Sequence, residues 1–417
     1  MKISIVGAGI SGLSTYIFLR KHLPSPPAPL PPHEFVIYDA YPAPSRKERE
    51  AGSTSIIGGG LGIAPNGKRM VRALSREIHQ AVVSQGYGVV RFQFNSARGW
   101  TIGSVPIVDL KGEPELMVMS SRQGMWECIS GPPPFRDEVS DEVLVRKKVV
   151  RVVRSVTGKP VLRFEDGGEE QFDLVIGADG IKSVVKEAIV GDKYPAIYTG
   201  FYSVGGFVPS ELLPQLPENN AELLPPKSQV VMTFGPGGFF GYGPFCAAPS
   251  SVCCKDPVIQ HLIRESEIKL KIATWVTPKL PTWASNGVVL VGDAAHALPS
   301  SSRQGASGAL EDAYAITFLL KHFLSLAYDS GSTSMSEEEA VQIASEKYCA
   351  IRKPHVEAIL DGAMKLEMRR DKAGIVAEYA MYFIMWIKCK FFPGYMNRPI
   401  YQYSVEAEIE KAIHSVK

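Results

Sequence analysis

Two stretches of the chain carry the unbroken apolar pattern of strands that are covered on both faces. They are residues 3–6 near the start and residues 288–291 much later. Each is followed by small residues and then by a helical pattern, at 13–19 after the first and 306–326 after the second. Parallel strands between two layers of helices have this composition. We therefore predict one α/β sheet that is assembled from distant segments of the chain.

The middle of the chain has the alternating pattern and the turn residues of antiparallel sheets. Residues 89–110 predict a β-hairpin, and a short helix is expected at 120–129. Within 143–180, strands are expected around a turn at 166–168. Residues 191–282 are rich in Tyr, Phe, Gly and Pro and predict a second, mainly antiparallel region.

A helical tail is expected after residue 330, because Ser336 and Glu339 have the spacing of a capping box. The return of the parallel-sheet pattern after an antiparallel insertion predicts domains built from separate segments. The predicted domains are a nucleotide-binding domain of 1–88, 120–190 and 283–330, a substrate domain of 89–119 and 191–282, and a C-terminal helical region of 331–417.

The turn after the first strand has the sequence GAGISG, in which Gly7, Gly9 and Gly12 match the G-x-G-x-x-G spacing. A strand precedes this turn and a helix follows it, which is the context that a dinucleotide site requires. The glycines allow a tight turn and a close approach of the backbone, and Ile10 and Ser11 open the helix whose N-terminus would face the pyrophosphate. The pattern predicts a dinucleotide but does not identify it.

An acidic partner for the adenosine ribose is expected at the end of the second strand, where Asp39 stands. Asp39 follows Gly12 by 27 residues, whereas the usual interval is about 20. The excess lies in the proline-rich segment 24–32, which we interpret as an inserted loop. A second glycine-rich stretch, FGPGGFFGYG at 234–243, leads into no amphipathic helix, so we expect a strand there and no second nucleotide site.

Composition narrows the range of partners. The chain has 417 residues, 21% of them charged, and a formal net charge of +2, so nothing indicates nucleic acid or an anionic membrane as a partner. The six cysteines have no metal-ligand spacing and are expected to be free thiols. The strand at residue 3 leaves no room for a signal peptide, which favours the cytoplasm.

One apolar stretch near the C-terminus, residues 374–392, raises the question of a membrane. Its uncharged part, 379–387, is nine residues long, and a span needs about 20. A helix that covers the core is the preferred interpretation, with peripheral membrane contact as an open alternative.

Four motifs then indicate a family. GAGISG at 7–12, GADG at 177–180, GDAAH at 292–296 and RQGASGALEDA at 303–313 occur in the order typical of the class A flavoprotein monooxygenases. From residue 1 to about 325, the chain resembles this para-hydroxybenzoate hydroxylase-like family, including its fungal and bacterial members that tailor natural products. The resemblance implies FAD as the dinucleotide. It also implies a Rossmann-like FAD-binding domain (GR2-type) interleaved with a mainly antiparallel β substrate domain, plus C-terminal helices.

The resemblance also implies roles for individual residues. Asp293 would bind the ribityl chain, Asp179 and Gly180 would lie at the pyrophosphate and a nicotinamide channel, and Arg122 would lie near the flavin. His296 is expected to be a packed structural histidine. The full set expected to bind the cofactor is Gly7, Gly9, Ile10, Ser11, Gly12, Asp39, Gly60, Arg122, Asp179, Gly180, Gly292, Asp293, Pro299, Gly305 and Ala306.

The implied reaction is oxygenation. NADPH or NADH would reduce FAD, O₂ would form a flavin C4a-hydroperoxide, and one oxygen atom would reach an organic substrate while water is excluded. The outcome would be hydroxylation or epoxidation, with Baeyer–Villiger oxygenation or a non-catalytic flavin-binding redox module as alternatives. A flavin halogenase is disfavoured because TWVTPKLPTW only superficially matches the W-x-W-x-I-P motif. No metal site or nucleophilic triad is indicated, and a monomer and a homodimer are both open.

The substrate region departs from the family at one position. Many relatives have an arginine near the first strand of this region, where this chain has Gly205. A buried anion without a partner is costly, so we predict a neutral, largely apolar small molecule as substrate. Candidates for catalytic roles are Arg122, Tyr202 and Tyr242, and the residues expected to line the pocket are Phe201, Tyr202, Phe207, Phe240 and Tyr242.

Overall fold

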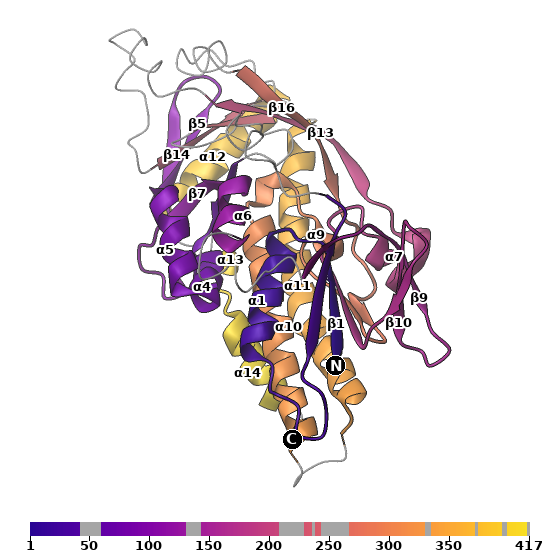
Figure 1. Ribbon diagram of the computed structural model, residues 1–417. Helices are drawn as coiled ribbons and strands as arrows, with labels where there is room; N and C mark the ends of the chain where they lie inside the picture. The colour runs from indigo at the N-terminus through magenta and orange to yellow at the C-terminus, as the bar shows by residue number, and fades with distance from the viewer. Residues whose placement is uncertain are drawn as a thin grey trace.

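A computed structural model of the chain is shown in Figure 1. It describes residues 1–41, 60–130, 143–207, 229–235, 238–242, 267–329, 335–371, 374–393 and 398–414.

The centre of the fold is a six-stranded sheet with the order β17-β18-β12-β1-β2-β8. Neighbouring strands are parallel from β18 to β8, and only the short edge strand β17 is antiparallel. The strands are β1 (Lys2–Val6), β2 (Glu34–Asp39), β8 (Leu144–Arg146), β12 (Leu174–Gly177), β17 (Ala284–Ser285) and β18 (Val288–Leu290). As the apolar pattern predicts, β1 and β18 are neighbours of the same strand although they are far apart in the sequence.

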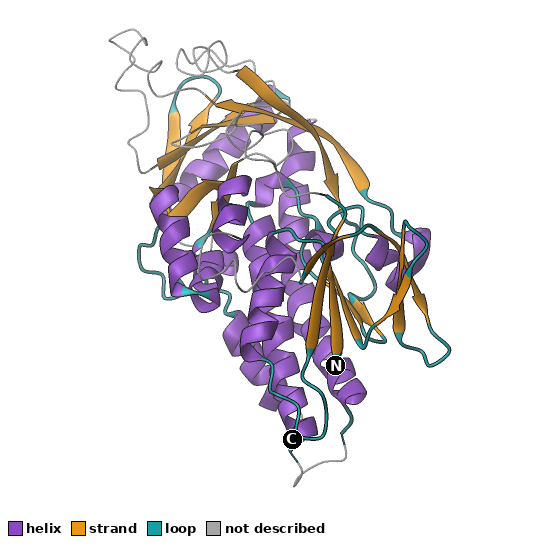
Figure 2. Cartoon of the chain, viewed as in Figure 1, coloured by secondary structure: helices purple, strands orange, loops and turns teal. Residues whose placement is uncertain are grey.

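Long helices lie against this sheet, as Figure 2 shows. Helix α1 (Ile10–His22) packs along α10 (Gly305–Tyr328), and α10 in turn packs along α11 (Glu337–Asp371). The rings of Phe18 and Tyr314 meet edge to face, with centroids 5.6 Å apart, at the contact of α1 with α10. Leu13, Ile316 and Leu320 are fully buried there. The buried apolar side chains of these helices and of the sheet form one continuous core.

A second sheet of four strands has the order β15-β14-β5-β6. Its strands are β5 (Arg91–Ser96), β6 (Thr101–Pro106), β14 (Gln229–Gly235) and β15 (Gly238–Tyr242). The hairpin expected at 89–110 is confirmed as β5 and β6, and the stretch expected to be a strand instead of a phosphate loop is confirmed as the hairpin β14–β15. However, β14 runs parallel to β5, so this region is less uniformly antiparallel than predicted.

Smaller elements complete the fold. They are β3 (Gly60–Ile63), β4 (Tyr87–Val89) and β7 (Met117–Ser121), which form one sheet; β9 (Val149–Arg154), β10 (Pro160–Phe164) and β11 (Glu169–Gln171), which form another; the pair β13 (Ile197–Phe207) and β16 (Glu267–Val276); and the helical segments α4 (Pro65–Leu74), α5 (Arg76–Gln85), α6 (Arg122–Ser130), α7 (Val184–Val190), η1 (Gly191–Lys193), α9 (Asp293–His296), η4 (Ser300–Ser302), α12 (Ile375–Phe391), α13 (Arg398–Tyr401) and α14 (Val405–His414).

The predicted fold class is confirmed: a parallel sheet with helices, additional β-sheets and C-terminal helices. The capping box is also present, since the Glu339 N–H donates to Ser336 Oγ at 3.1 Å and the Ser336 N–H donates to Glu339 Oε2 at 2.8 Å. The domain boundaries stay predictions.

The C-terminal stretch that raised the question of a membrane forms α12. Tyr382 and Cys389 on one face are buried, but the opposite face is exposed, so this helix covers the fold with one face only. No helix among the described residues is long and apolar enough to cross a membrane. The cytoplasmic location stays a prediction.

Candidate functional site

The predicted cofactor residues meet at one edge of the central sheet. Because β1, β2, β12 and β18 are parallel, their carboxyl ends lie along the same edge. Gly7 follows β1, Asp39 ends β2, Asp179 follows β12 and Gly292 follows β18. Ligands of open α/β sheets bind outside this edge. The structure therefore brings together three of the four motifs that were recognised separately in the sequence, and Asp39 with them.

Close packing explains three of the glycines. A Cβ atom at Gly12 would lie 1.9 Å from the Gly7 carbonyl oxygen, and one at Gly7 would lie 2.4 Å from the Ala178 carbonyl oxygen. Gly7 also has a φ of +105°, which disfavours any side chain. A Cβ atom at Gly292 would lie 2.8 Å from Ser11 Oγ. The first, second and third motifs thus touch one another through backbone that has no room for a side chain.

Three other glycines face open space. A Cβ atom at Gly9, Gly180 or Gly305 would meet no protein atom within 4 Å. Gly9 is the N-cap of α1, which has no side-chain cap and no acidic residue in its first turn. The first backbone N–H groups of α1 are therefore available to a ligand. The positive end of the helix dipole lies at the same place and favours an anion. Ser11 Oγ beside these N–H groups is buried and has no hydrogen-bond partner within the described part of the chain.

Asp39 is held by the glycine-rich turn itself. One carboxylate oxygen, Oδ2, accepts a hydrogen bond from the Ala8 N–H at 2.6 Å, and Oδ1 accepts one from the Tyr41 N–H at 2.8 Å. The Arg146 guanidinium lies 3.9 Å from Oδ1. Each carboxylate oxygen keeps further acceptor capacity, so the group is fixed in place and can still accept a hydroxyl.

Asp179 has a structural contact and a free atom. Its Oδ2 accepts hydrogen bonds from the Val184 and Val185 N–H groups at 2.7 and 3.3 Å, at the start of α7. Burial raises the pKa of this carboxyl group, and hydrogen bonds from Ser183 and the α7 backbone only partly offset that effect. Its other oxygen, Oδ1, is buried without a partner in the described residues. Asp179 therefore caps a helix and also leaves one buried acceptor for a ligand.

Asp293 is the first residue of α9, after the N-cap Gly292. Its backbone carbonyl accepts a hydrogen bond from Thr277 Oγ1 at 3.2 Å, whereas its carboxylate makes no hydrogen bond or ion pair within the regions that the structure describes. The side chain is partly exposed. A helix cap is therefore not its role here, and the carboxylate is available to accept hydroxyl groups.

Arg122 and Gly60 lie next to each other although their sequence separation is large. Gly60 in β3 pairs with Ser121 in β7, and Arg122 follows directly as the first residue of α6. Its side chain is exposed. Helix α6 is tied to the glycine-rich turn by Trp126, whose Nε1–H donates to the Ala8 carbonyl at 2.8 Å. Helix α6, which begins with Arg122, is thus attached to the glycine-rich turn through Trp126. The roles of Gly60 and Arg122 near a cofactor stay predictions.

Behind these residues lies a buried network of charges that the sequence analysis missed. Asp312 Oδ2 accepts the Gly292 N–H at 3.0 Å, and Asp312 Oδ1 accepts Arg352 Nε–H at 2.9 Å. Arg352 also pairs with Glu311 at 2.9 Å, and Asn66 donates to Glu311 at 3.0 Å. All four side chains are essentially inaccessible to solvent. The two adjacent acidic residues inside an otherwise apolar helix pattern, ALEDA, were the available signal.

The pKa values in this network show which charges hold it together. Burial alone would raise the pKa of Asp312, but the nearby His296 and Arg352 outweigh that effect and lower it to about 2. Burial raises the pKa of Glu311, and Arg352 only partly offsets this. Burial opposes the charged form of Arg352, yet the two carboxylates raise the pKa of its guanidinium well above the ordinary value. Asp312 and Arg352 are therefore a stable buried ion pair.

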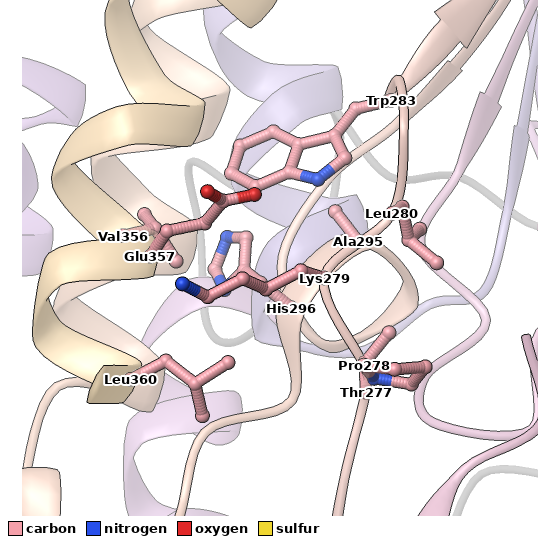
Figure 3. A pocket seen from close by; sticks show the side chains of 10 residues that line it. All are labelled: Thr277, Pro278, Lys279, Leu280, Trp283, Ala295, His296, Val356, Glu357 and Leu360. Carbon is pink, nitrogen blue, oxygen red and sulfur yellow. The ribbon is translucent and has the colours of Figure 1, made fainter. Parts of the chain in front are cut away.

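His296 belongs to the same network. Its Nε2 lies in close hydrogen-bond contact with Asp312, and its ring lies 5.0 Å from the Trp283 ring. Figure 3 shows it beside Trp283 and Lys279 in a small pocket next to α11. That pocket contains none of the residues predicted to bind cofactor or substrate. The geometry agrees with the expectation of a packed structural histidine.

The segment before α10 carries Pro299, Gly305 and Ala306. Pro299 is buried and precedes η4, and Gly305 and Ala306 open α10. Between them, Arg303 has a φ of +54°, which side chains rarely adopt. Gly305 faces open space at this helix N-terminus. The segment thus presents bare backbone and one arginine to the region between the two larger sheets.

Arg303 is a second group that the sequence analysis missed. Its guanidinium carbon lies 4.1 Å from the centre of the Phe92 ring in β5, and Nη1 lies 3.6 Å from Met232 Sδ in β14. Burial lowers the pKa of this arginine. No carboxylate pairs with it among the residues that the structure describes. The Arg303 side chain therefore reaches from the predicted cofactor side to the predicted substrate sheet.

Two of the predicted substrate residues share a face of that sheet. Phe240 pairs with Thr233, and Tyr242 pairs with Val231, so both aromatic side chains lie on the face that carries Thr233. Both are buried, with ring centroids 5.8 Å apart. Thr233 Oγ1 is buried on this face without a hydrogen-bond partner in the described residues. The face combines an aromatic surface with one available polar atom.

The remaining substrate candidates lie elsewhere. Phe201, Tyr202 and Phe207 are in β13, which pairs only with β16 in the described sheets. Tyr202 is 50% exposed and its ring lies 5.7 Å from the ring of Tyr198. The structure thus places Tyr202 on an exposed aromatic surface with Tyr198 and Trp275. Gly205 is in the same strand, opposite Leu270.

Comparisons with known proteins agree with this arrangement. No protein-family model matches the chain. It is 22% identical over 405 residues to an aurachin C monooxygenase/isomerase of Stigmatella aurantiaca, with 94% of this chain and 93% of the relative covered. It is 26% identical over 343 residues to a 3-amino-4-hydroxybenzoate 2-monooxygenase of Streptomyces cremeus, covering 75% and 76%.

Among solved structures, the fold matches Klebsiella pneumoniae HpxO in complex with FAD. The TM-score is 0.71 at 18% sequence identity, and the match covers 96% of this chain and 99% of that one. Full-length relatives and a shared fold therefore agree with the three motifs that meet at the sheet edge. The chain is thus similar over most of its length to FAD-dependent monooxygenases, and it has the fold of solved proteins that bind FAD.

Proposed function

We propose that this protein uses NAD(P)H and O₂ to add one oxygen atom to a small organic molecule, with FAD as its cofactor. The observation that carries the proposal is the set of unused groups at the sheet edge. These are the uncapped N-terminus of α1, the open space at Gly9 and Gly305, and the carboxylate of Asp293, which has no partner among the described residues. Together they provide donors for a pyrophosphate and an acceptor for hydroxyl groups.

The residues present fit FAD along its length. The backbone around Gly9 and Ser11 would hold the pyrophosphate, with Gly180 beside it, and Asp39 would accept the ribose hydroxyls. Asp293 would accept hydroxyls of the ribityl chain. When bound, a flavin accepts hydride from a nicotinamide and activates O₂.

This chain's own residues would place the flavin and stabilise its charge. The N-terminus of α10 at Gly305 would stabilise negative charge near the reduced ring system, since it carries the positive end of a 24-residue helix dipole. His296 is not expected to donate or accept a proton in the reaction, because its Nε2 atom is in hydrogen-bond contact with Asp312. The protein's contribution is therefore placement, exclusion of water and electrostatic support.

The substrate is proposed to be neutral and largely apolar. Phe240 and Tyr242 give the second sheet a buried aromatic face, and Gly205 stands where an anion-binding arginine is expected. An apolar lining with few polar groups is typical of small-molecule sites. Hydroxylation or epoxidation is the proposed outcome, with Baeyer–Villiger oxygenation as the alternative on the same fold.

Arg303 favours a second candidate, a substrate with an acidic group. Its guanidinium has no carboxylate partner among the described residues and contacts Phe92 and Met232 of the second sheet. An arginine fork matches a carboxylate or phenolate well. One relative is named for a benzoate, 3-amino-4-hydroxybenzoate, which is an acid of this kind.

The test begins with the purified protein. We expect denaturation to release FAD, and we expect an apolar polycyclic compound to stimulate NADPH oxidation and to gain one oxygen atom from ¹⁸O₂. Simple hydroxybenzoates should not stimulate oxidation. Coupled turnover of a hydroxybenzoate would favour the second candidate, and bound flavin with no turnover of any compound would favour a non-catalytic flavin module.

A further inference from the structure

Helix α12 has an apolar face that the described part of the fold leaves uncovered. Val376, Tyr379, Phe383 and Trp386 follow one another at intervals of three or four residues and are 84%, 43%, 60% and 40% exposed. Residues at these intervals share one side of a helix. The apolar face of α12, as used below, consists of Ile375, Val376, Tyr379, Phe383, Ile384, Trp386, Phe391 and Phe392, each at least 40% exposed.

Such a continuous surface is unusual for an isolated chain in water. Single exposed apolar side chains are normal, but contiguous patches mark sites of interaction. The exposed fractions of Phe391 and Phe392 are 59% and 56%, so the surface continues past the end of the helix. A helix that is apolar on both its buried and its exposed side requires an apolar environment on both.

The opposite side of α12 is fixed to the substrate sheet. Tyr382 donates its hydroxyl hydrogen to the Phe234 carbonyl in β14 at 2.7 Å. Gly103 in β6 lies so close to Cys389 that a Cβ atom at Gly103 would be 2.5 Å from Cys389 Cβ. Helix α12 packs against β6, and Figure 1 shows it beside β14. The apolar face is therefore held outward by a rigid attachment.

The charges around this face have one sign. Within 374–393 the charged residues are Glu378, Lys388 and Lys390. Glu378 is buried and neutralised by Arg98 at 3.2 Å, while Lys388 and Lys390 are exposed. The Lys390 ammonium lies 4.8 Å from the centre of the Trp386 ring. Aromatic side chains beside exposed lysines are the combination that binds the headgroup region of anionic lipids.

We propose that the apolar face of α12 docks onto an anionic lipid surface, with the helix lying in the plane of the interface. The helix has 17 residues, or about 25 Å at 1.5 Å per residue. It would insert Phe383 and Trp386 among the acyl chains and place Lys388 and Lys390 at the headgroups. The substrate sheet, to which α12 is fixed, would then lie directly above the lipid.

Charge distinguishes this partner from a second copy of the chain. A two-fold contact brings the same surface of both copies together. Lys388 and Lys390 of both copies would then lie in one interface, with no exposed carboxylate on the described part of α12 to compensate. An anionic lipid surface supplies the compensating charge.

The experiment measures co-sedimentation of the 417-residue protein with vesicles of phosphatidylcholine alone or with about one third phosphatidylserine, an anionic lipid. We expect binding to the anionic vesicles. The double variant Phe383→Ser with Trp386→Ser should bind at least about tenfold more weakly. The pair Lys388→Gln with Lys390→Gln should lose the preference for anionic vesicles. Val156→Ser is the matched control, because Val156 is fully exposed in the turn between β9 and β10.

Each variant is first checked for circular dichroism and flavin content, and its mass in solution is measured by sedimentation velocity. The proposal is overturned if the unmodified protein does not bind anionic vesicles, or if the Phe383/Trp386 double variant binds as well as the Val156 control. It is also overturned if the unmodified protein forms a dimer that this double variant dissociates, because the partner would then be a second copy. The outcome does not depend on the proposed oxygenation.

Discussion

The carboxylate of Asp293 stands at the start of α9 without a hydrogen bond in the described part of the chain, while the helix is capped by Gly292. Asp293→Ala is therefore expected to leave the fold intact and to weaken FAD binding by about 1–3 kcal/mol, the value of a lost acceptor for buried hydroxyls. Fluorescence titration of the apoprotein with FAD measures this. Asp192→Ala, at an exposed aspartate in η1, is the control and should leave the affinity unchanged. Equal affinities in both variants would remove Asp293 from the cofactor site.

Arg303 allows the two substrate candidates to be separated at one position. For the neutral substrate that we propose, Arg303→Met should change KM by less than about threefold, since no ion pair is lost. For an acidic substrate KM should rise about tenfold to a hundredfold, because a charge-assisted hydrogen bond contributes about 1.5–3 kcal/mol. Steady-state NADPH oxidation measures both, and Arg91→Met, at an exposed arginine of the same strand as Phe92, is the control. A large KM increase would contradict the neutral-substrate proposal.

Single residues differed in how far the sequence revealed them. The positions of Gly9, Asp39 and Asp293 at the sheet edge could be predicted because each belongs to a local pattern of strand, turn and helix. Their roles in cofactor binding stay predictions. Arg303 and Arg352 could not be predicted, since their importance comes from contacts with Phe92 in β5 and Asp312 in α10. Local patterns do not contain such distant pairs. The role of Arg122 as a residue near the cofactor stays a prediction.

At the scale of one element, two glycines of the turn between β1 and α1 allow effects on folding and effects on cofactor binding to be measured separately. Gly12→Ala would place a Cβ atom 1.9 Å from the Gly7 carbonyl oxygen, so we expect a loss of stability of at least about 1–3 kcal/mol. Gly9→Ala meets no protein atom within 4 Å and keeps an allowed backbone conformation, with φ −76°. It should leave apoprotein stability unchanged but weaken FAD binding at least about tenfold, or about 1.4 kcal/mol.

Thermal unfolding of the apoproteins and FAD titration distinguish these two effects. If Gly9→Ala binds FAD normally, the open space at this turn does not hold the pyrophosphate. If Gly12→Ala is as stable as the unmodified protein, the turn is able to relax more than its packing indicates.

The positions of helices and strands were easier to predict from the sequence than the pairing of the strands and the packing of the helices. The alternating pattern of 89–110 predicted β5 and β6, and the glycine-aromatic stretch predicted a strand and not a phosphate loop. The parallel pairing of β14 with β5 was not predicted, because pairing direction depends on how the chain returns to the sheet. Likewise, the pattern of 374–392 predicted a helix, but only the structure showed which face is uncovered.

At the scale of the whole molecule, Arg352 joins three helices. From α11 it reaches Glu311 and Asp312 in α10, and Asp312 reaches the N-cap of α9 at Gly292. Arg352→Met would leave two buried carboxylates without their cation, so we expect stability to fall by about 3–5 kcal/mol. Denaturant unfolding measures this. Lys353→Met, on the same helix at a surface ion pair with Glu357, should change stability by less than about 1 kcal/mol. Similar losses in both variants would mean that the buried network contributes little.

Asp312 and Arg352 connect Gly292 to α11. We therefore expect the free energy of FAD binding to be coupled to the folding of α11. The backbone that presents Asp293 is hydrogen-bonded to Asp312, which is paired with α11, and Tyr348 of α11 donates a further hydrogen bond to the Leu290 carbonyl at 3.0 Å. A ligand that binds only the ordered form stabilises it by about 2.7 kcal/mol at a hundred times its Kd. Saturating FAD should therefore slow deuterium uptake at the backbone amides of α11, well away from the sheet edge, whereas uncoupled segments would exchange at the same rate with and without the cofactor.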